Sequence, residues 1–348
     1  MPKKTTFVFS LNNSFVQKDI KTLKKLGIRV LKIQSKPFRS PFLFLWNRKL
    51  ELLKSFIYIP RSSAVIVWFN DYHAFFPLLI ARILFKKGVV IVGGYDAVKD
   101  AEINYGIFLK PGIRQTLARW NYQLADQVWV VHKTLSEGCP TALKQNNIKS
   151  GIRVFMPNLK TPILEVPTGY DPQFWCCEET KIPKSILTVA NINDARTFNR
   201  KGIPTFVALA KRLPGYQFTI AGVAFKDGKA LDLPPNIRVL GKQRPEELKK
   251  VYGQHYYYFQ GSKIEGLPNV LCEAMLCECV PIGNAVFGIP EAIGDTGHLF
   301  QGHSDLETVV TFLQNPSTHK PKDARKRIVK KYHQDLRTHQ FQNLMETH

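Results

Sequence analysis

The stretch YYYFQGSKIEGLPNVLCEAMLCECVPIGNAVFGIPEAIGD, residues 256–295, decides the fold that the sequence predicts. It begins with a β-rich run, continues through a short glycine-containing loop and becomes helical near Pro268. Proline suits a first helical turn, because the N–H that it lacks would have no partner there. The amides of Gly266, Leu267 and Asn269 would lie at the helix N-terminus, a ready site for phosphate or sugar oxygens. The stretch therefore predicts a strand, an anion-binding loop and a helix.

Two glutamates lie beside this predicted anion site. Glu265 is in the loop, and Glu273 follows on the helix. An ionised carboxylate repels phosphate but accepts hydrogen bonds, and sugars are rich in hydroxyl donors. The hypothesis is that Glu265 binds the hydroxyl groups of a sugar and Glu273 those of a ribose, with a diphosphate between them. Two isolated glutamates would be ordinary surface charges, but their position in this run favours the binding role.

The same alternation of strand and helix extends outward over the whole chain. Short β-rich runs separated by amphipathic segments are typical of βα units and a parallel sheet. The predicted strands of a first sheet are TTFVFSL, IRVLKI, AVIVWF, GVVIVG and DQVWVV, and those of a second are SILTVANI, YQFTIAG, NIRVLG, YYYFQGS, VPIGNA and GHLF. The chain of 348 residues is long enough for two such domains.

The domain boundary is predicted where periodicity stops. Residues 166–184, VPTGYDPQFWCCEETKIPK, collect Pro, Gly and charged residues as a linker does. We therefore expect a first α/β domain over 1–165 and a second over 185–320. Residues 321–348 are expected to form a helix that packs back toward the first domain.

The motif S-x-x-EGLPNVLCEAM, followed by CVP and GIPEAIGDTG, resembles the donor-site signature of retaining nucleotide-sugar glycosyltransferases of family 4 (group 1). The run VPTGYDPQFW is similar to the interdomain loop of that family, and the resemblance extends over most of the chain. It implies the GT-B architecture, an α/β fold of two facing Rossmann-like domains with parallel sheets and a deep interdomain cleft. Residues 1–165 would be the acceptor domain and residues 185–320 the nucleotide-sugar-binding domain. It also implies transfer of a sugar to a glycan or lipid-linked acceptor with retention of anomeric configuration, as in polysaccharide biosynthesis.

The resemblance assigns donor-site roles to particular residues. It places Glu265 at the donor sugar and Glu273 at the nucleotide ribose, and it gives the amides of Gly266 and Leu267 to the sugar or phosphate. Lys201-Gly202 matches the family's Lys-Gly element, which holds the diphosphate. The family's Gly-Arg pair is replaced by Ala190-Asn191, so the guanidinium would come from the longer loop that follows, either from Arg196 or from Arg200. Such cations are needed because negative charge builds on the leaving diphosphate.

Acceptor-side residues are expected at the carboxyl ends of strands, where α/β sheets bind their ligands. Asp71 and His73 follow the strand AVIVWF, and Gly94 and Asp96 follow GVVIV. Glycine permits close backbone approach. A core or helix-capping role for each of these side chains is an equally open alternative.

Charge is unevenly distributed along the chain, whose net charge is +22. Residues 1–165 hold 26 Lys and Arg against 9 Asp and Glu, and the remainder holds 23 against 18. The first half is therefore expected to face something anionic, such as lipid head groups, nucleic acid or a phosphorylated substrate. Segment 41–61, PFLFLWNRKLELLKSFIYIPR, combines aromatic and aliphatic residues with cations as an interfacial helix does, although a core-facing helix is the alternative.

Localisation and partners follow from what the sequence lacks. No apolar run reaches the roughly 18 residues of a membrane span, so we expect a cytoplasmic protein that is soluble or peripheral at the inner face of the membrane. Six cysteines without paired C-x-x-C arms are expected to be reduced thiols. No Asp-x-Asp pair occurs, so no metal or other cofactor is expected. The alternatives are a nucleotide-sugar epimerase and a non-enzymatic membrane- or nucleic-acid-binding protein, although no nucleic-acid motif is present.

Overall fold

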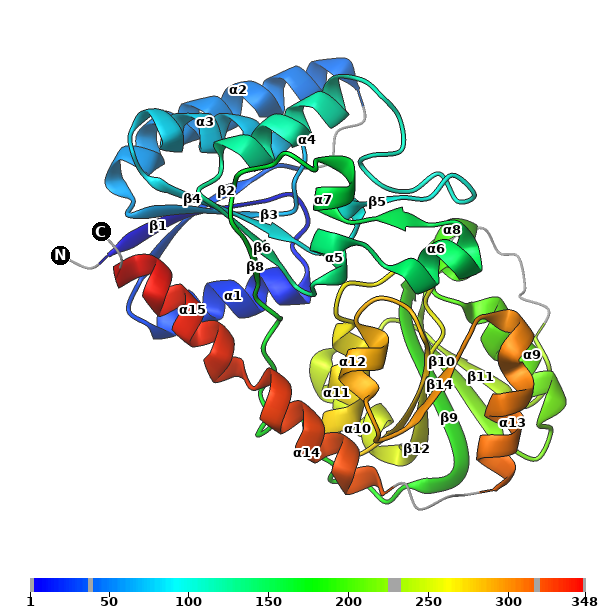
Figure 1. Ribbon diagram of the computed structural model, residues 1–348. Helices are drawn as coiled ribbons and strands as arrows, with labels where there is room; N and C mark the ends of the chain where they lie inside the picture. The colour runs from blue at the N-terminus through cyan, green and yellow to red at the C-terminus, as the bar shows by residue number, and fades with distance from the viewer. Residues whose placement is uncertain (1–2, 37–39, 225–232, 316–319, 347–348) are drawn as a thin grey trace. The chain divides into compact units, whose positions relative to one another are not determined.

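The computed structural model describes residues 3–36, 40–224, 233–315 and 320–346. The chain forms two compact units (Figure 1). Unit 1 comprises Met1–Cys139, Ile148–Thr168 and Asp335–His348, and unit 2 comprises Pro140–Asn147 and Gly169–Gln334. The C-terminal residues thus return to the first unit, and a short piece of the N-terminal half belongs to the second.

Unit 1 is built on a parallel sheet of six strands in the order β2-β1-β3-β4-β6-β8. The strands are β1 Lys4–Phe9, β2 Arg29–Gln34, β3 Ala64–Trp68, β4 Lys87–Val92, β6 Gln127–Val130 and β8 Ile163–Glu165. Every residue of β3 is buried. This continuous apolar run is typical of a central parallel strand that is covered on both faces.

Helices cover both faces of the first sheet. In Figure 1, α2, α3 and α4 lie side by side over one face, and α1 and α15 lie on the opposite face. The helices of this unit are α1 Ser14–Lys25, α2 Pro41–Tyr58, α3 Phe75–Ile83, α4 Ile113–Leu124, α5 Thr134–Glu137, α7 Ile152–Phe155 and α15 Gln334–Glu346. Shorter elements are the 3-10 turns η1 Ile59–Arg61, η2 Tyr72–Ala74 and η3 Tyr95–Ala97, and the antiparallel pair β5 Val98–Lys99 and β7 Lys149–Ser150.

Unit 2 contains a second six-stranded parallel sheet, in the order β11-β10-β9-β12-β13-β14. Numbered within the unit this order is 3-2-1-4-5-6, the dinucleotide-binding topology, whose strand order reverses between β9 and β12. The strands are β9 Ile182–Ile192, β10 Gln217–Val223, β11 Ile237–Leu240, β12 His255–Gln260, β13 Val280–Asn284 and β14 His298–Phe300.

The core of unit 2 is rich in phenylalanine. The ring of Phe206 packs 5.2 Å from that of Phe218, and Phe259 stacks 5.2 Å from Phe300. The helices around this core are α6 Pro140–Asn146, α8 Ala195–Arg200, α9 Ile203–Arg212, α10 Pro245–Gln254, α11 Asn269–Leu276, α12 Ile289–Ile293, α13 Leu306–Gln314 and α14 Pro321–Tyr332, with the 3-10 turn η4 His303–Asp305.

The prediction of an α/β chain with two parallel sheets is confirmed, and every predicted strand is present. Three details differ. The strand β8 completes the first sheet although it has only three residues, too few for a clear pattern. The C-terminal segment is two helices, because His333 has extended backbone between α14 and α15. The helix after Glu265 begins at Asn269, with Pro268 as its extended N-cap.

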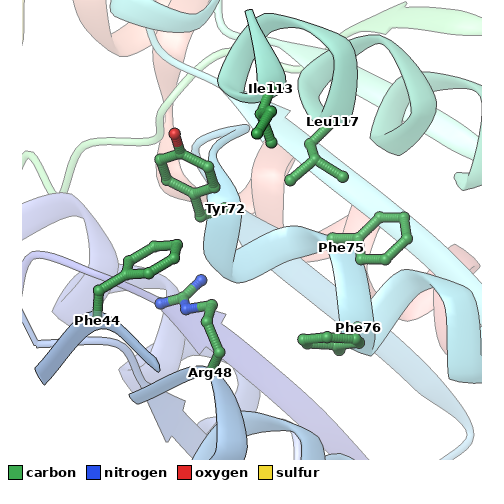
Figure 2. A pocket seen from close by; sticks show the side chains of 7 residues that line it. All are labelled: Phe44, Arg48, Tyr72, Phe75, Phe76, Ile113 and Leu117. Atoms are coloured by element: carbon green, nitrogen blue, oxygen red, sulfur yellow. The ribbon is translucent and has the colours of Figure 1, made fainter. Parts of the chain in front are cut away.

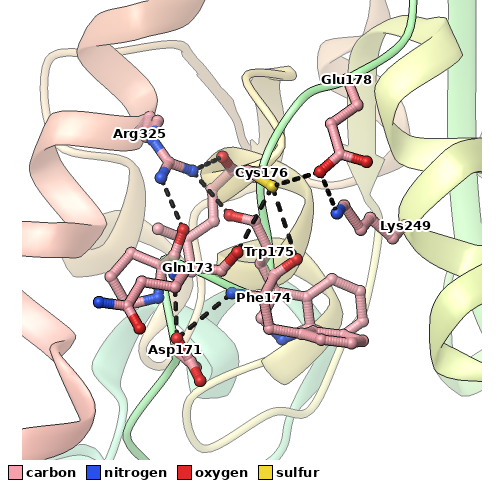
Figure 3. A network of polar contacts seen from close by, with 10 residues as sticks. Asp171, Gln173, Phe174, Trp175, Cys176, Glu178, Lys249 and Arg325 are labelled. Carbon is pink, nitrogen blue, oxygen red and sulfur yellow. Dashed lines mark hydrogen bonds and ion pairs between the residues drawn. The ribbon is translucent and has the colours of Figure 1, made fainter.

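Of the segment predicted as a linker, 166–184, residues 166–168 belong to unit 1 and residues 169–184 belong to unit 2, where they make several hydrogen bonds (Figure 3). Arg325 of α14 donates hydrogen bonds to the carbonyl oxygens of Pro172, Trp175 and Leu276. Asp171 accepts from the backbone of Gln173 and Phe174, at 2.9 and 3.3 Å, and closes a turn. These contacts are made by backbone carbonyl oxygens, which every residue has. They therefore leave no periodic pattern of side chains in the sequence.

Candidate donor and acceptor sites

The loops that follow β9 and β12 bring Lys201 and Glu265 together in unit 2. These two strands are the neighbours between which the strand order reverses, and open α/β sheets bind their ligands at the carboxyl ends of such strands. Lys201 Nζ donates to Glu265 Oε1, and the two side chains are only 18% and 14% exposed. A lysine and a glutamate 64 positions apart in sequence thus form one charged pair at the expected binding edge.

Burial and the neighbouring charges shift the pKa values of both members of this pair. Burial lowers the pKa of Lys201, and the carboxylate of Glu265 partly offsets that effect. Burial would raise the pKa of Glu265, but the positive charges of Lys201 and Arg200 outweigh it, so the pKa of this carboxyl is lowered. Unit 2 therefore presents a partly exposed carboxylate and ammonium, each of which can bind a polar ligand if the pair separates.

A chain of hydrogen bonds from Ser262 and its neighbours orients the side chain of Glu265. Ser262 Oγ donates to Glu265 Oε1 at 3.0 Å and accepts from Gln260 Nε2 at 2.8 Å. The Ser262 carbonyl oxygen in turn accepts from Asn284 Nδ2 at 3.2 Å. Because these side chains are buried, they limit the positions that the carboxylate can adopt.

Two glycines allow the loops to meet. Gly202 has φ +71°, in the left-handed region that favours glycine. A Cβ at this position would lie 2.0 Å from the carbonyl oxygen of Gly261. The Lys-Gly pair is thus explained by packing: glycine lets the backbone after Lys201 approach the end of β12, and this brings the lysine to Glu265.

The structure places Arg196 and Arg200, the two candidates for the guanidinium near Lys201, in different surroundings. Arg200 ends α8, its charge acts on both Lys201 and Glu265, and its carbonyl oxygen accepts from the amide of Lys263 at 2.9 Å. Arg196 is 52% exposed and lies 3.9 Å from Asp194, the N-cap of the same short helix. Arg200 is therefore the guanidinium beside the pair, and Arg196 is placed at the solvent-exposed start of α8.

The helix α11 carries the remaining donor-side residues. Glu273 is buried beside the phenols of Tyr252 and Tyr258, whose pKa values are raised first by burial and further by its charge. Asn269 Oδ1 is buried and has no hydrogen-bond partner among the residues described. Gly266 and Leu267 are also buried, directly before the start of α11. A buried acceptor without a partner is costly, so Asn269 is available to a ligand N–H or O–H.

In unit 1 the acceptor-side residues lie together at the carboxyl edge of β3 and β4. Asp71 receives two hydrogen bonds from Arg114 of α4, one of them from Nε at 2.8 Å. The side-chain bond of Arg114 lowers the pKa of Asp71 against the effect of burial. Arg114 is a partner that the sequence analysis missed, since only the packing of α4 beside η2 brings it to Asp71.

Asp96 and His73 are held by the backbone. Asp96 accepts from the amides of Asn70, Gly93 and Gly94, at 3.1, 3.2 and 2.9 Å, and burial raises its pKa to about 6. His73 is buried, and its Nε2 lies 3.0 Å from the carbonyl oxygen of Trp68. This placement supports a loop-capping role for both side chains, the alternative that the sequence left open.

The sequence around the donor-side residues is similar to that of a known family. Residues 188–324 match the family model for glycosyl transferases group 1. This part of unit 2 is therefore similar to the group 1 glycosyl transferases. The match spans β9 through the start of α14 and includes Lys201, Glu265 and Glu273. Among curated proteins, none matches the chain by sequence.

Solved structures share the fold of the whole chain. Sucrose-phosphate synthase from Thermosynechococcus elongatus has a TM-score of 0.70 at 13% identity, with 98% of each chain covered. HepE from Anabaena, in complex with UDP, has a TM-score of 0.66 at 12% identity, with 99% of this chain and 100% of that one covered. The catalytic domain of starch synthase IV from Arabidopsis thaliana, bound to ADP and acarbose, has a TM-score of 0.69 at 10% identity over 99% of both chains. The fold is therefore that of the GT-B glycosyltransferases.

The matched part of unit 2 also contains a residue to which the sequence analysis gave no role. Ser262 is the first residue of the S-x-x-E motif, and its hydroxyl binds Glu265. The signal was present in the three-residue spacing, which permits a tight loop in which the hydroxyl reaches the carboxylate. The sequence does not reveal that Gln260 and Asn284 support Ser262, because they lie on different strands.

Proposed function

We propose that this chain is a retaining glycosyltransferase that moves a sugar from a nucleotide-diphosphate sugar to a glycan or lipid-linked acceptor. The observation that supports this most directly is the ion pair of Lys201 and Glu265, with Arg200 beside it, at the reversal point of the sheet in the part of unit 2 that matches group 1. The relatives HepE and starch synthase IV hold UDP and ADP, the type of leaving group proposed here. Unit 2 would bind the donor and unit 1 the acceptor.

The ion pair suggests how the donor is accommodated. In the absence of donor, Lys201 and Glu265 neutralise one another. When a nucleotide sugar binds, the ammonium can turn to the diphosphate, and the carboxylate can accept hydrogen bonds from the sugar hydroxyls. As the bond to the sugar breaks, negative charge grows on the diphosphate, and Lys201, Arg200 and the amides that begin α11 stabilise it.

A panel of nucleoside diphosphates tests donor binding, and product stereochemistry tests the reaction. Isothermal calorimetry against UDP, GDP and ADP should give binding to one base. With the corresponding nucleotide sugar, NMR of the product should give the same anomeric configuration as the donor. Inverted product would refute retention, and binding of none of the three nucleotides would refute the donor site.

Glu273→Gln should weaken binding of the preferred nucleoside diphosphate by about 10- to 100-fold in Kd, because one or two charge-assisted hydrogen bonds to the ribose would be lost. Calorimetry measures this directly. The matched control is Glu246→Gln, the same change at an exposed position in the first turn of α10, which should bind as the unaltered protein does. Equal affinities for both variants would remove Glu273 from the site.

Transfer should continue in EDTA at an undiminished rate. The proposed reason is that Lys201 and Arg200 supply the positive charge that a divalent ion supplies at an Asp-x-Asp pair, and the chain has no such pair. The measurement is the initial rate with and without chelator, followed by addition of Mg²⁺ and Mn²⁺. Activity that disappears in EDTA and returns with either ion would overturn the expectation.

We propose that the protein acts in polysaccharide biosynthesis in the cytoplasm. The inner face of the membrane would be its second location. All six cysteines are free thiols, as a reducing compartment requires. Within the part of the chain that the structure describes, no helix is long and apolar enough to cross a bilayer. Nothing in the group 1 match favours an epimerase or a non-enzymatic binding protein.

A further inference from the structure

The helix α2 carries an unusual surface for a soluble protein. Of its eighteen residues only Glu51 and Ser55 are buried, while Phe42 is 73%, Leu45 65% and Phe56 60% exposed. The exposed apolar side chains of this helix are Phe42, Leu43, Leu45, Trp46, Leu53, Phe56 and Ile57. A core-facing helix would bury such residues, so the structure is against that alternative for segment 41–61. Contiguous apolar surface of this kind marks an interaction site.

The apolar surface continues beyond α2 on the same side of the first sheet. In Figure 1, α2, α3 and α4 lie side by side. Ile83 at the end of α3 and Ile113 at the start of α4 are exposed, and Phe85 after α3 is 97% exposed. We refer to α2, α3 and α4 together as the three-helix face.

A pocket of about 310 Å³ opens among these helices (Figure 2). Its walls are mostly apolar, with one cation and the hydroxyl-bearing Tyr72, and they are formed by Phe44, Arg48, Tyr72, Phe75, Phe76, Ile113 and Leu117. Figure 2 shows the guanidinium of Arg48 reaching toward the middle of this ring of side chains. A site with an apolar wall and a single positive group suits a ligand that has both a chain and an oxygen-rich head.

Arg48 has hydrogen-bonding capacity that the protein does not use. Its Nη2 donates to Ser35 Oγ and Glu51 Oε1, each at 2.6 Å. Its Nε and Nη1 are buried, and neither has a hydrogen-bond partner in the described residues. An unpaired buried donor on a charged group is unfavourable, so an acceptor oxygen that enters the pocket would be stabilised there.

The charge of the three-helix face favours an anionic ligand. The helices carry six cations, Arg48, Lys49, Lys54, Arg82, Arg114 and Arg119, and one acid, Glu51. Three of these cations are paired with an acid, Arg48 with Glu51, Arg114 with Asp71 and Arg82 with Asp126, which leaves Lys49, Lys54 and Arg119 as the cations without an ion pair among the contacts described. The remaining lysines lie next to exposed apolar residues, as they do in helices that rest on lipid head groups.

We propose that the three-helix face binds an anionic phospholipid surface, and that the pocket takes one lipid of it. A phosphate oxygen of this lipid would accept from Nη1 of Arg48, and its chain would lie among Phe75, Phe76 and Leu117. Exposed Phe42, Trp46 and Phe56 would enter the acyl boundary. This binding holds unit 1, the proposed acceptor side, at the surface where a lipid-linked acceptor is found, so the biological purpose rests on the proposed function but the binding itself does not.

Vesicle co-sedimentation of the full chain, without donor, tests the inference. Vesicles of phosphatidylcholine alone should not retain the protein, and vesicles that also contain phosphatidylglycerol should. Arg48→Gln should weaken binding about fivefold, the effect of one cation near an anionic surface. Phe56→Ser should weaken it about tenfold, because one aromatic side chain no longer enters the bilayer. Matched controls are Lys24→Gln on α1 and Leu336→Ser on α15, both exposed and both expected to bind normally.

Further arms separate the possible explanations. Since Arg48→Gln leaves Glu51 buried without its ion pair, the double variant R48Q/E51Q is measured beside it and should bind as weakly as R48Q. Inorganic phosphate should not displace the protein from vesicles. If it does so fully, and if Phe56→Ser binds vesicles normally, the pocket is a site for free phosphate and the proposal is overturned. If the protein does not bind vesicles but self-associates, and if Phe56→Ser abolishes the self-association, the three-helix face is an interface with a second copy of the chain. Equal vesicle binding by all variants would also overturn the inference, while leaving sugar transfer unaffected.

Discussion

Replacing Glu265 by glutamine is expected to lower kcat by about 100- to 1,000-fold while leaving nucleotide affinity within a factor of about three, as for an electrostatic group that acts mainly in the transition state. Glutamine keeps the size of the side chain but removes the negative charge that balances Lys201. It also loses part of the ability to accept from sugar hydroxyls, which are donors. As the bond to the diphosphate breaks, positive charge develops on the sugar, and a carboxylate beside the ring stabilises it better than an amide does.

The measurement is the steady-state rate with the nucleotide sugar, together with calorimetry of the nucleoside diphosphate. Glu307→Gln is the matched control, since Glu307 is an exposed carboxylate of unit 2 that pairs with Arg212 and lies on α13. Ser262→Ala offers an independent check. It removes the hydroxyl that orients Glu265 at 3.0 Å and should give a smaller loss of kcat. Normal kcat in Glu265→Gln would remove this residue from the reacting centre.

Replacing Lys201 by methionine is expected to cost a further large factor, about 100- to 1,000-fold in kcat, because methionine fills the same space without the charge that stabilises the leaving diphosphate. Lys201→Arg should retain more activity than Lys201→Met. Arginine keeps the positive charge, although its planar fork differs in shape from an ammonium. Lys211→Met, at an exposed position in the last turn of α9, is the control for a charge removed from the same unit.

The two residues should also be measured in combination. In the double variant E265Q/K201M the losses are expected to be smaller than the product of the single losses, because each single variant leaves the other charge buried and unpaired. A melting curve of each variant separates loss of folding from loss of function. Additive losses would mean that the two side chains act independently in the reaction, in contradiction to the paired role proposed here.

The local sequence pattern was sufficient to predict the strands and the two sheets of this protein. Parallel strands buried on both faces, such as β3, need long apolar runs, and such runs are visible without any structure. The loop and helix around Glu265 could also be predicted, since Pro268 and the glycines constrain the backbone at their own positions. These features depend on neighbours in sequence, so the positions of both glutamates and of Lys201-Gly202 followed from the chain alone.

Side-chain partners were decided only by the tertiary structure. Arg196 and Arg200 cannot be told apart by sequence, but in the structure it is the charge of Arg200 that lowers the pKa of Glu265, while Arg196 lies near Asp194. Arg114 reaches Asp71 because α4 packs beside η2, and the exposed face of α2 depends on which neighbours cover it. Sequence patterns record the environment along a strand or helix, whereas these contacts join residues tens of positions apart. The sequence by itself therefore determined the two α/β sheets and the loop and helix around Glu265, and long-range packing selected the groups that surround them.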